Sequence, residues 1–166
     1  GSAAAGRKST NWFVAHNAKL IYSEYLNLDT DHNGMLSRRE LRAYRGGTLT
    51  ATFVDRVFEE TLTYRCEDHA QASAEPGELA MDYKTWLDFV LAMENKKTPE
   101  AFRYFWRLLD VQKCGFLQLW TINYFYRDIA ARLRELGHDA PAIDDVNSEI
   151  FDMAKPRNAM RITYDD

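Results

Sequence analysis

The sequence predicts an all-α protein made of four helix–loop–helix units that associate in two pairs. Three observations support this prediction: one twelve-residue loop has a strict spacing of acidic side chains, apolar residues recur at helical spacing on both sides of it, and the same frame returns three more times along the chain. With 166 residues the chain is long enough to bury a core of its own, and 13% aromatic residues indicate a core built largely of rings.

The loop is the stretch Asp29-Thr30-Asp31-His32-Asn33-Gly34-Met35-Leu36-Ser37-Arg38-Arg39-Glu40. It fits the EF-hand calcium loop at every diagnostic position, since acids or amides stand at positions 1, 3, 5 and 12 and glycine stands at the sharp turn. Calcium prefers about six to eight oxygen ligands, and a loop of this kind supplies them in sequence order. We therefore predict one Ca²⁺ site with the ligand residues Asp29, Asp31, Asn33, Met35, Ser37 and Glu40.

Each ligand position has its own role. The side chains at positions 1, 3 and 5 offer oxygens directly, Met35 offers its backbone carbonyl, Ser37 acts through a water molecule, and Glu40 offers both carboxylate oxygens. Three carboxylates repel one another until a doubly charged ion neutralises them, which favours an affinity on the order of 10⁻⁷ to 10⁻⁵ M. The alternative interpretation is a loop with the same fold that stays empty or holds magnesium.

Helices are predicted on both sides of this loop. An entering helix is expected over residues 11–28, where apolar residues recur every three or four positions. The exiting helix follows the loop and is expected to turn Leu41 and Tyr44 toward the core until Gly46-Gly47 ends it. A second entering helix is expected to begin near Thr52, with the Thr52 hydroxyl as its cap.

The second hand of this pair is predicted to be structural. Residues 65–80 are expected to form a surface loop, because they combine proline and glycine with several alanines and acids. Met81 then takes position 8 of the repeated frame, and Trp86 and Phe89 take the inward places on its exiting helix. Since the preceding segment lacks the acidic ligands of the first loop, this hand is expected to hold no metal.

The third hand keeps the frame but loses the ligands. Thr98-Pro99-Glu100 is a helix-start pattern. Four residues of the helix that it opens are expected to point inward: Phe102, Phe105, Trp106 and Leu109. The loop at residues 110–121 retains an acid at position 1 and a glycine at position 6, but Gln112, Cys114 and Thr121 replace the other ligands. Calcium binding at the third hand is therefore not expected.

A fourth entering helix is expected at residues 144–153, followed by a ligand-free loop with Ile162 at position 8. The fourth exiting helix is expected to be missing. Paired EF-hand loops join through a short two-stranded ribbon at position 8, so Leu36 is expected to face Met81 and Leu117 to face Ile162.

These units predict the domain organisation. Residues 1–10 are interpreted as a tag remnant and linker, residues 11–95 as an N-terminal pair that contains the calcium-binding hand, and residues 96–166 as a degenerate C-terminal pair. The alternative is an unrelated helical bundle with one calcium loop, which must explain why ring residues recur in the same frame three times.

Composition excludes several classes of function. A net charge of −4 argues against a nucleic-acid partner, which needs a basic surface. No apolar run approaches the ~20 residues of a membrane helix and no signal peptide is found, so a cytoplasmic location is expected. Cys66 and Cys114 lack metal-binding spacing and are expected to be reduced thiols. The chain is not expected to be an enzyme, because no serine or cysteine nucleophile stands beside any histidine: His16, His32, His69 or His138.

Several strings along the chain resemble the B″ regulatory subunits of protein phosphatase 2A. They span nearly all of residues 11–164 and are Asn11-Trp12-Phe13, Tyr25-Leu26-Asn27-Leu28-Asp29, Asp55-Arg56-Val57-Phe58, Met81-Asp82-Tyr83-Lys84-Thr85, residues 105–110, Asn123-Tyr124-Phe125-Tyr126, and Glu149-Ile150-Phe151-Asp152-Met153 with Lys155-Pro156. Within that family the chain resembles most the gamma-type branch, which includes the plant cytoskeletal protein FASS (TONNEAU), because the first hand has an intact loop and the third is degenerate.

The resemblance implies a non-catalytic regulatory role and the same six calcium ligands. B″ subunits dock to the scaffold and catalytic subunits of the phosphatase and select where it acts. The gamma-type branch adds cytoskeletal or centrosomal proteins as partners and microtubule-organising or cortical sites as locations. Our hypothesis is that calcium in the first loop tunes docking to the phosphatase. Two alternatives are a cytoskeletal adaptor that acts without phosphatase, and a free-standing calcium sensor or buffer that grips amphipathic helices, although five scattered methionines do not supply the groove typical of such sensors.

Overall fold

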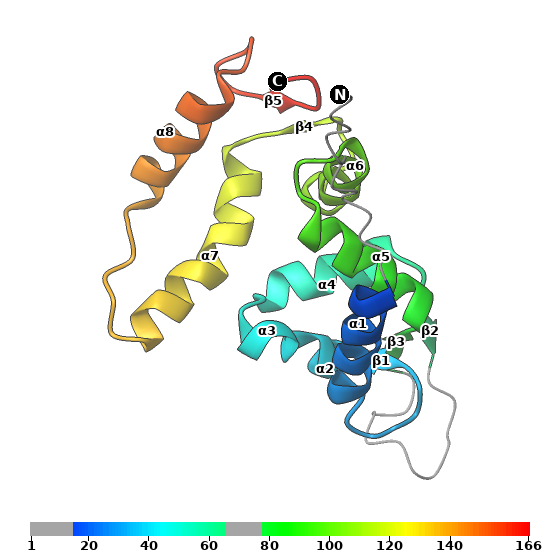
Figure 1. Cartoon of the computed structure of the whole chain (residues 1–166). Coiled ribbons are helices and arrows are strands. Elements are labelled where there is room, and N and C mark those ends of the chain that lie inside the picture. Colours follow the sequence, from blue (N-terminus) through cyan, green and yellow to red (C-terminus); the bar gives the residue numbers. More distant parts are fainter. Residues whose placement is uncertain (1–14, 66–77) are drawn as a thin grey trace, which may run out of the picture.

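The structure of the chain, a computed structural model, describes residues 15–65 and 78–166 (Figure 1). Its first part contains α1 (Ala15–Leu28), β1 (Leu36–Ser37), α2 (Arg38–Arg42), α3 (Tyr44–Gly47), α4 (Ala51–Glu60), β2 (Tyr64–Arg65), β3 (Leu79–Met81) and α5 (Tyr83–Glu94). Its second part contains α6 (Pro99–Leu109), β4 (Phe116–Leu117), α7 (Leu119–Glu135), α8 (Ile143–Ala154) and β5 (Ile162–Thr163). The predicted all-α fold class is confirmed, and the predicted tag remnant lies outside the described residues.

Both predicted ribbons between loops are present. Leu36 of β1 pairs with Met81 of β3, and Leu117 of β4 pairs with Ile162 of β5, each in antiparallel register. The first ribbon differs from the prediction because it has three strands, in the order β1-β3-β2. The additional strand β2 follows α4 and pairs with the edge of β3 that β1 leaves open. The position-8 residues therefore join the hands in the two predicted pairs.

Two local predictions need correction. The segment predicted as a surface loop, residues 65–80, begins and ends in strands that pair with each other, and residues 66–77 within it lie outside the described part. Helix α4 begins earlier than predicted, because Thr50 rather than Thr52 is its N-cap: the Thr50 hydroxyl accepts a hydrogen bond from the Phe53 amide at 3.2 Å. Thr50 and Thr52 are equally good cap residues by sequence, and the structure shows that Thr50 is the one that caps the helix.

The core lies in the N-terminal pair, and rings form its centre. The four residues predicted to face inward on the two exiting helices are completely buried: Leu41, Tyr44, Trp86 and Phe89. The Tyr44 ring meets Trp86 and Phe89 edge to face, with centroids 5.4 and 5.2 Å apart, an arrangement that the ring quadrupoles favour. Helix α6 adds Ala101, Tyr104 and Leu108 to the same cluster, so the core continues past the predicted boundary at residue 95.

Helix α6 turns a different face to the core from the one predicted. Its start is as expected, since Thr98 caps it and accepts a hydrogen bond from the Ala101 amide. Of the four residues predicted to be inward, Phe105 is half-buried and packs against the edge of the core, Trp106 and Leu109 are half-buried, and Phe102 is exposed. Phe102 and Trp106 contact the Tyr164 ring, with centroids 4.8 and 5.5 Å away. The alanine in the buried row allows close approach of α6 to α4 and α5, which accounts for the choice of face.

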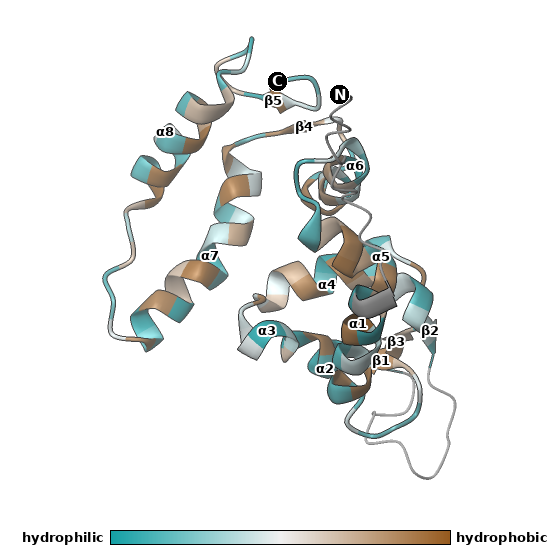
Figure 2. Ribbon diagram, viewed as in Figure 1, coloured by the Kyte–Doolittle hydropathy of each residue, from teal (hydrophilic) through white to brown (hydrophobic). Residues whose placement is uncertain are grey.

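Helices α7 and α8 lie beside the group formed by α1 to α6 (Figure 1). Both carry apolar residues along their length (Figure 2), but α7 and α8 bury few side chains. In the described chain after residue 110, the buried residues are Thr121, Ala130 and Asn147. Val146 and Ile150 of α8 are half-buried, and Met153 is 70% exposed. The C-terminal pair therefore has few fully buried side chains compared with the N-terminal pair.

Two polar joints fix α4 to the third hand. Arg56 is 4% exposed, and its Nε donates to the Leu108 carbonyl at the end of α6 at 3.0 Å while its guanidinium pairs with Glu60 at 2.9 Å. The carboxylate of Asp128 on α7 accepts from the backbone amide and the hydroxyl of Thr52 at 2.8 and 2.6 Å. These hydrogen bonds from Thr52 hold the pKa of Asp128 below its ordinary value.

No helix in the described ranges combines the length and the apolar character that crossing a membrane requires. Cys114 is an exposed free thiol in the third loop, and Cys66 lies outside the described residues.

Candidate metal centre

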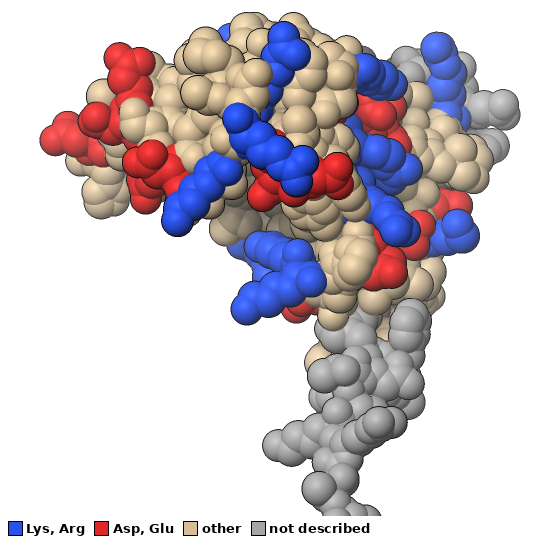
Figure 3. All heavy atoms as spheres, turned by 90° about the horizontal axis from the view of Figure 1, so that it is seen from above, with Lys and Arg blue, Asp and Glu red and all other residues tan. Residues whose placement is uncertain are grey.

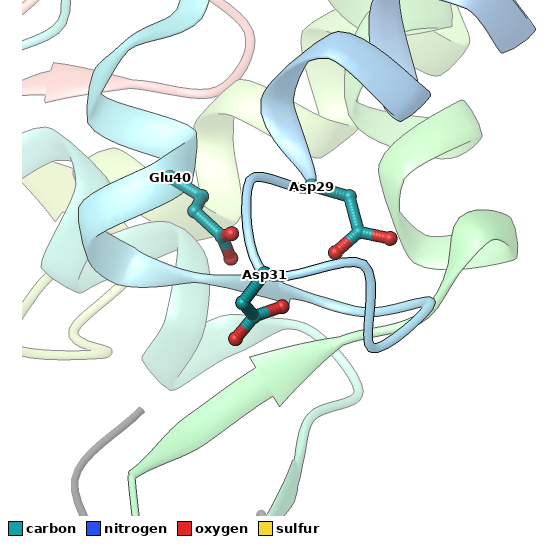
Figure 4. Close-up of side chains that lie close together, drawn as sticks. All are labelled: Asp29, Asp31 and Glu40. Atoms are coloured by element: carbon teal, nitrogen blue, oxygen red, sulfur yellow. The ribbon is translucent and has the colours of Figure 1, made fainter. Parts of the chain in front are cut away.

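Three carboxylates converge at the first loop. Asp29 lies directly after α1, Asp31 lies two residues further, and Glu40 lies in the first turn of α2 (Figure 4). One ligand oxygen from each lies within 4.8 Å of the others. Asp29 and Glu40 are 2% and 6% exposed, and Asp31 is half-buried. The structure thus brings together the three acidic ligands that the sequence predicts.

Backbone amides hold the Asp29 carboxylate in place. It accepts hydrogen bonds from the Asn33 amide at 3.1 Å and the Gly34 amide at 2.9 Å, so that the loop wraps around it. Burial raises the pKa of Asp29, and the neighbouring Asp31 and Glu40 raise it further, against the effect of the two amides. Negative charge is therefore concentrated here beyond what the loop itself compensates.

Glu40 is fixed by four donors. Its Oε1 accepts from the amide and the hydroxyl of Thr30 at 2.8 and 2.9 Å, and its Oε2 accepts from the amide and the hydroxyl of Ser37 at 2.9 Å each. Ser37 and Glu40 also form a capping box, because the Ser37 oxygen accepts from the Glu40 amide at the start of α2. The position-12 carboxylate thereby joins the beginning of the loop to the beginning of the exiting helix.

Asn33 lies beside Asp31 at the tip of the loop. Its backbone amide donates to Asp31 Oδ1 at 3.1 Å, its side-chain nitrogen donates to Asp31 Oδ2 at 3.0 Å, and its Oδ1 accepts from the Met35 amide at 2.8 Å. The ligand roles of Asn33, Met35 and Ser37 stay predictions. Their places in the loop agree with those roles, since all three lie on the segment that connects the acids.

The donor set fits a hard divalent cation. Carboxylate, amide and carbonyl oxygens are the ligands that calcium prefers. Neither Asp29 nor Glu40 forms an ion pair with a lysine, arginine or histidine of residues 15–65 or 78–166. Buried carboxylates without such a partner favour the binding of a cation, which would add the positive charge that their hydrogen-bond donors lack. When bound, calcium would be held by Asp29, Asp31 and Glu40 with oxygens from the intervening segment.

Two contributors to this site were not identified from the sequence. The Tyr25 hydroxyl on α1 donates to the Gly34 carbonyl at 2.6 Å, which ties the tip of the loop to the core. Thr30 provides two of the four donors to Glu40. The Tyr25 contact carries no sequence signal beyond its apolar helical place. The S-x-x-E capping box at Ser37, in contrast, is a recognisable pattern.

The third loop repeats the backbone of the first without its ligands. Asp110 accepts from the Cys114 and Gly115 amides at 3.0 and 2.8 Å, as Asp29 does at the equivalent positions. A side-chain hydrogen bond of 2.9 Å joins Gln118 to Gln112, across positions 9 and 3 where an ion would take ligands. In the described part of the chain, the first loop is the one place where three or more acids, histidines or cysteines cluster in this way.

The comparisons with known proteins agree with this architecture. No protein-family model matches the chain. The chain is 48% identical to the gamma-type B″ regulatory subunit of serine/threonine-protein phosphatase 2A from Xenopus tropicalis and 46% identical to the human protein of the same name, over 96% of this chain and 33% and 32% of those proteins. It is 42% identical to TON2 of Arabidopsis thaliana, a probable B″ regulatory subunit of the same phosphatase, again over 96% of this chain and 32% of that protein.

A solved structure shows the same fold. The chain matches a PP2A PR70 holoenzyme structure labelled diCa with a TM-score of 0.72 and 25% identity, over 89% of this chain and 50% of that one. The chain thus spans about a third of the length of the curated relatives it matches. The predicted resemblance is confirmed: over nearly its whole length this chain is a relative of the B″ regulatory subunits of protein phosphatase 2A, and of their gamma and TON2 members in particular.

Proposed function

We propose that this chain is a calcium-binding regulatory module of protein phosphatase 2A. In this role it corresponds to part of a B″ subunit, performs no catalysis itself, and docks the scaffold and catalytic subunits so that the phosphatase is directed to its substrates. The observation that carries the proposal is the 48% identity to a gamma-type B″ regulatory subunit across 96% of the chain. A cytoplasmic location and cytoskeletal partners belong to the same proposal, and the cytoskeletal partners rest on the gamma-type resemblance alone.

The acidic cluster of the first loop supports the calcium part of the proposal. Asp29, Asp31 and Glu40 bring three carboxylates within 4.8 Å, and Glu40 lies in the first turn of α2. An ion bound there would fix the position of α2 relative to α1, because its ligands come from the end of one helix and the start of the other. The expected effect of calcium is therefore an ordering of the first hand.

The packing of α6 argues against a large opening of the N-terminal pair. Calcium sensors open to expose a groove that receives an amphipathic helix from a target. Here α6 already packs against α4 and α5, with Tyr104 and Leu108 in the common core. Opening would have to expel this helix and expose its buried side chains. The module is thus suited to presenting a rigid surface rather than to gripping a target helix.

A capture experiment tests the proposal. The chain is immobilised and incubated with purified scaffold and catalytic subunits of protein phosphatase 2A, once with calcium and once with a chelator. The proposal expects capture that is strengthened by calcium in the wild type and is insensitive to calcium in the variant Glu40→Gln. Absence of capture under both conditions would refute the docking role. Capture that is equal with calcium and with chelator would refute only the regulatory role of the ion.

A further inference from the structure

One face of α7 is left uncovered by both of its neighbours. Asp128 bonds to α4, while Asn123 and Tyr126 bond to Asn147 and Pro141, at α8 and the segment before it. With 3.6 residues per turn, the residues between these two contact faces form a strip about 80° wide and about 21 Å long. We call this strip the α7 stripe, and it consists of Trp120, Tyr124, Arg127, Ala131 and Arg134.

The composition of the α7 stripe is unusual for a solvated helix face. Trp120 is 45% exposed and stacks on Tyr124, with centroids 5.2 Å apart and an interplanar angle of 19°. Arg127 and Arg134 are exposed, and neither takes part in an ion pair among the described residues. Tryptophan, tyrosine and arginine are the residues most enriched at the energetic centres of protein interfaces. Two rings and two such arginines thus stand together on a rigid helix.

The charge of the α7 stripe itself, two arginines and no acid, indicates the kind of partner. Acidic side chains gather at the α8 end of the molecule, and basic side chains gather over the middle of the face seen in Figure 3. The acids of α8 are Asp144, Asp145, Glu149 and Asp152. The stripe itself contains two arginines and no acid, and the nearby Asp128 is turned to Thr52 of α4. An opposing surface that is acidic and has an apolar patch complements it.

We propose that the α7 stripe is a docking surface for an acidic, partly apolar surface of the phosphatase 2A scaffold–catalytic core. Trp120 and Tyr124 supply the apolar contact, and Arg127 and Arg134 pair with carboxylates of the partner. Arginine suits this task because its planar fork binds a carboxylate through two hydrogen bonds. This inference rests on the proposed function, and it names the helix face that performs the docking.

The test measures binding of the purified scaffold–catalytic core to the whole chain, for the wild type and single variants. Trp120→Ala is expected to weaken binding about 10-fold or more, as truncation of a central tryptophan does. Arg127→Glu and Arg134→Glu are each expected to weaken it by about 10-fold, mainly through slower association, and to reduce its dependence on salt. The matched controls lie on other exposed faces: Arg103→Glu on α6 and Leu20→Ala on α1, which are expected to bind like the wild type.

The outcomes separate the inference from the proposed function. If the wild type binds the core and the three stripe variants bind equally well, the docking role of the α7 stripe is refuted and the regulatory role stands. If the wild type does not bind at all, both fall. Sedimentation of the chain alone tests whether a second copy of the chain binds the α7 stripe instead. If the chain self-associates and the stripe variants abolish this self-association but leave binding to the core unchanged, the stripe is a contact between copies and the proposal is overturned. Unchanged circular dichroism of each variant verifies that folding is intact.

Discussion

Removal of the Glu40 charge is the most direct test of the candidate metal centre. A ligand that binds only the folded chain stabilises it by RT ln(1 + [L]/Kd), which is about 2.7 to 5.5 kcal/mol at 1 mM calcium for dissociation constants on the order of 10⁻⁵ to 10⁻⁷ M. For a chain of this size each kcal/mol shifts the thermal midpoint by about 2 to 4 °C. Calcium is therefore expected to raise the midpoint of the wild type by about 5 to 20 °C, and that of Glu40→Gln by none.

The substitution also acts without calcium, through two opposing effects. Glutamine keeps one carbonyl oxygen, so it retains one pair of the four donors now bonded to Glu40 and loses the other, at about 1.5 to 3 kcal/mol for each hydrogen bond to a charged group. It also removes the repulsion from Asp29 and Asp31, which is about 3.5 kcal/mol or more for each pair of charges that lie within 4.8 Å of each other, at an effective dielectric constant of about 20. Because these terms oppose each other, the informative quantity is the difference between midpoints with and without calcium.

Differential scanning fluorimetry with 1 mM calcium or with chelator measures that difference. Asp110→Asn is the matched control, because Asp110 holds position 1 of the third loop in the same way as Asp29 holds the first. Its calcium-dependent shift is expected to equal that of the wild type. The assignment fails if Glu40→Gln keeps the full shift, or if the control loses it.

Three further predictions concern the joints and the third loop. Arg56→Met is expected to lower the free energy of unfolding by about 1 to 3 kcal/mol in urea titrations, because it removes the donor to the Leu108 carbonyl and leaves Glu60 with Lys113 as its ion-pair partner. Since the pKa of Asp128 is held below its ordinary value of 3.8, its bond to α4 stabilises the fold fully above that pH and loses this contribution as the pH falls through the lower folded-state pKa. The stability advantage of wild type over Asp128→Asn should therefore stay constant above about pH 5 and shrink as the pH falls below about 4 in the same titrations, and a difference that stays constant in that acid range would contradict the assignment. Copying the ligands of the first loop into the third should raise the calcium stoichiometry in calorimetry from one to two, with these substitutions: Gln112→Asp, Cys114→Asn and Thr121→Glu.

The loop frame could be predicted because its residues are fixed by local geometry. Position 6 requires a positive φ, and Gly34 and Gly115 have φ values of 80° and 79°. The residue two places earlier is also left-handed in both loops, at φ 56° for His32 and 52° for Lys113. Once these turns are set, position 8 must lie on the ribbon. The pairing of Leu36 with Met81 therefore follows from the sequence.

The inward face of α6 was not predictable in the same way. Apolar residues cover one broad arc of this helix, so helical periodicity identifies the apolar side but not which part of it lies innermost. The row that contains Ala101 and Tyr104 is buried because α4 and α5 pack against it, and that contact joins segments far apart in sequence. Phe102 belongs to the other row, which contacts the Tyr164 ring instead. Tertiary packing, rather than the pattern itself, decides between two such faces.

Helix α4 connects the candidate metal centre to the third hand. Arg38 of α2, two residues before the predicted ligand Glu40, pairs with Asp55 of α4 at 3.4 Å and lies over the Phe58 ring at 5.4 Å. The same helix holds α6 through Arg56, and its first turn is bonded to α7. An ion that fixes α2 therefore also acts on α4, because Arg38 joins the two helices. Helix α4 is in turn bonded to α6 and α7 of the second pair. Under the proposed function, this series of contacts accounts for how calcium at the first loop would influence the position of α7, although the third loop next to α7 lacks the ligands for an ion.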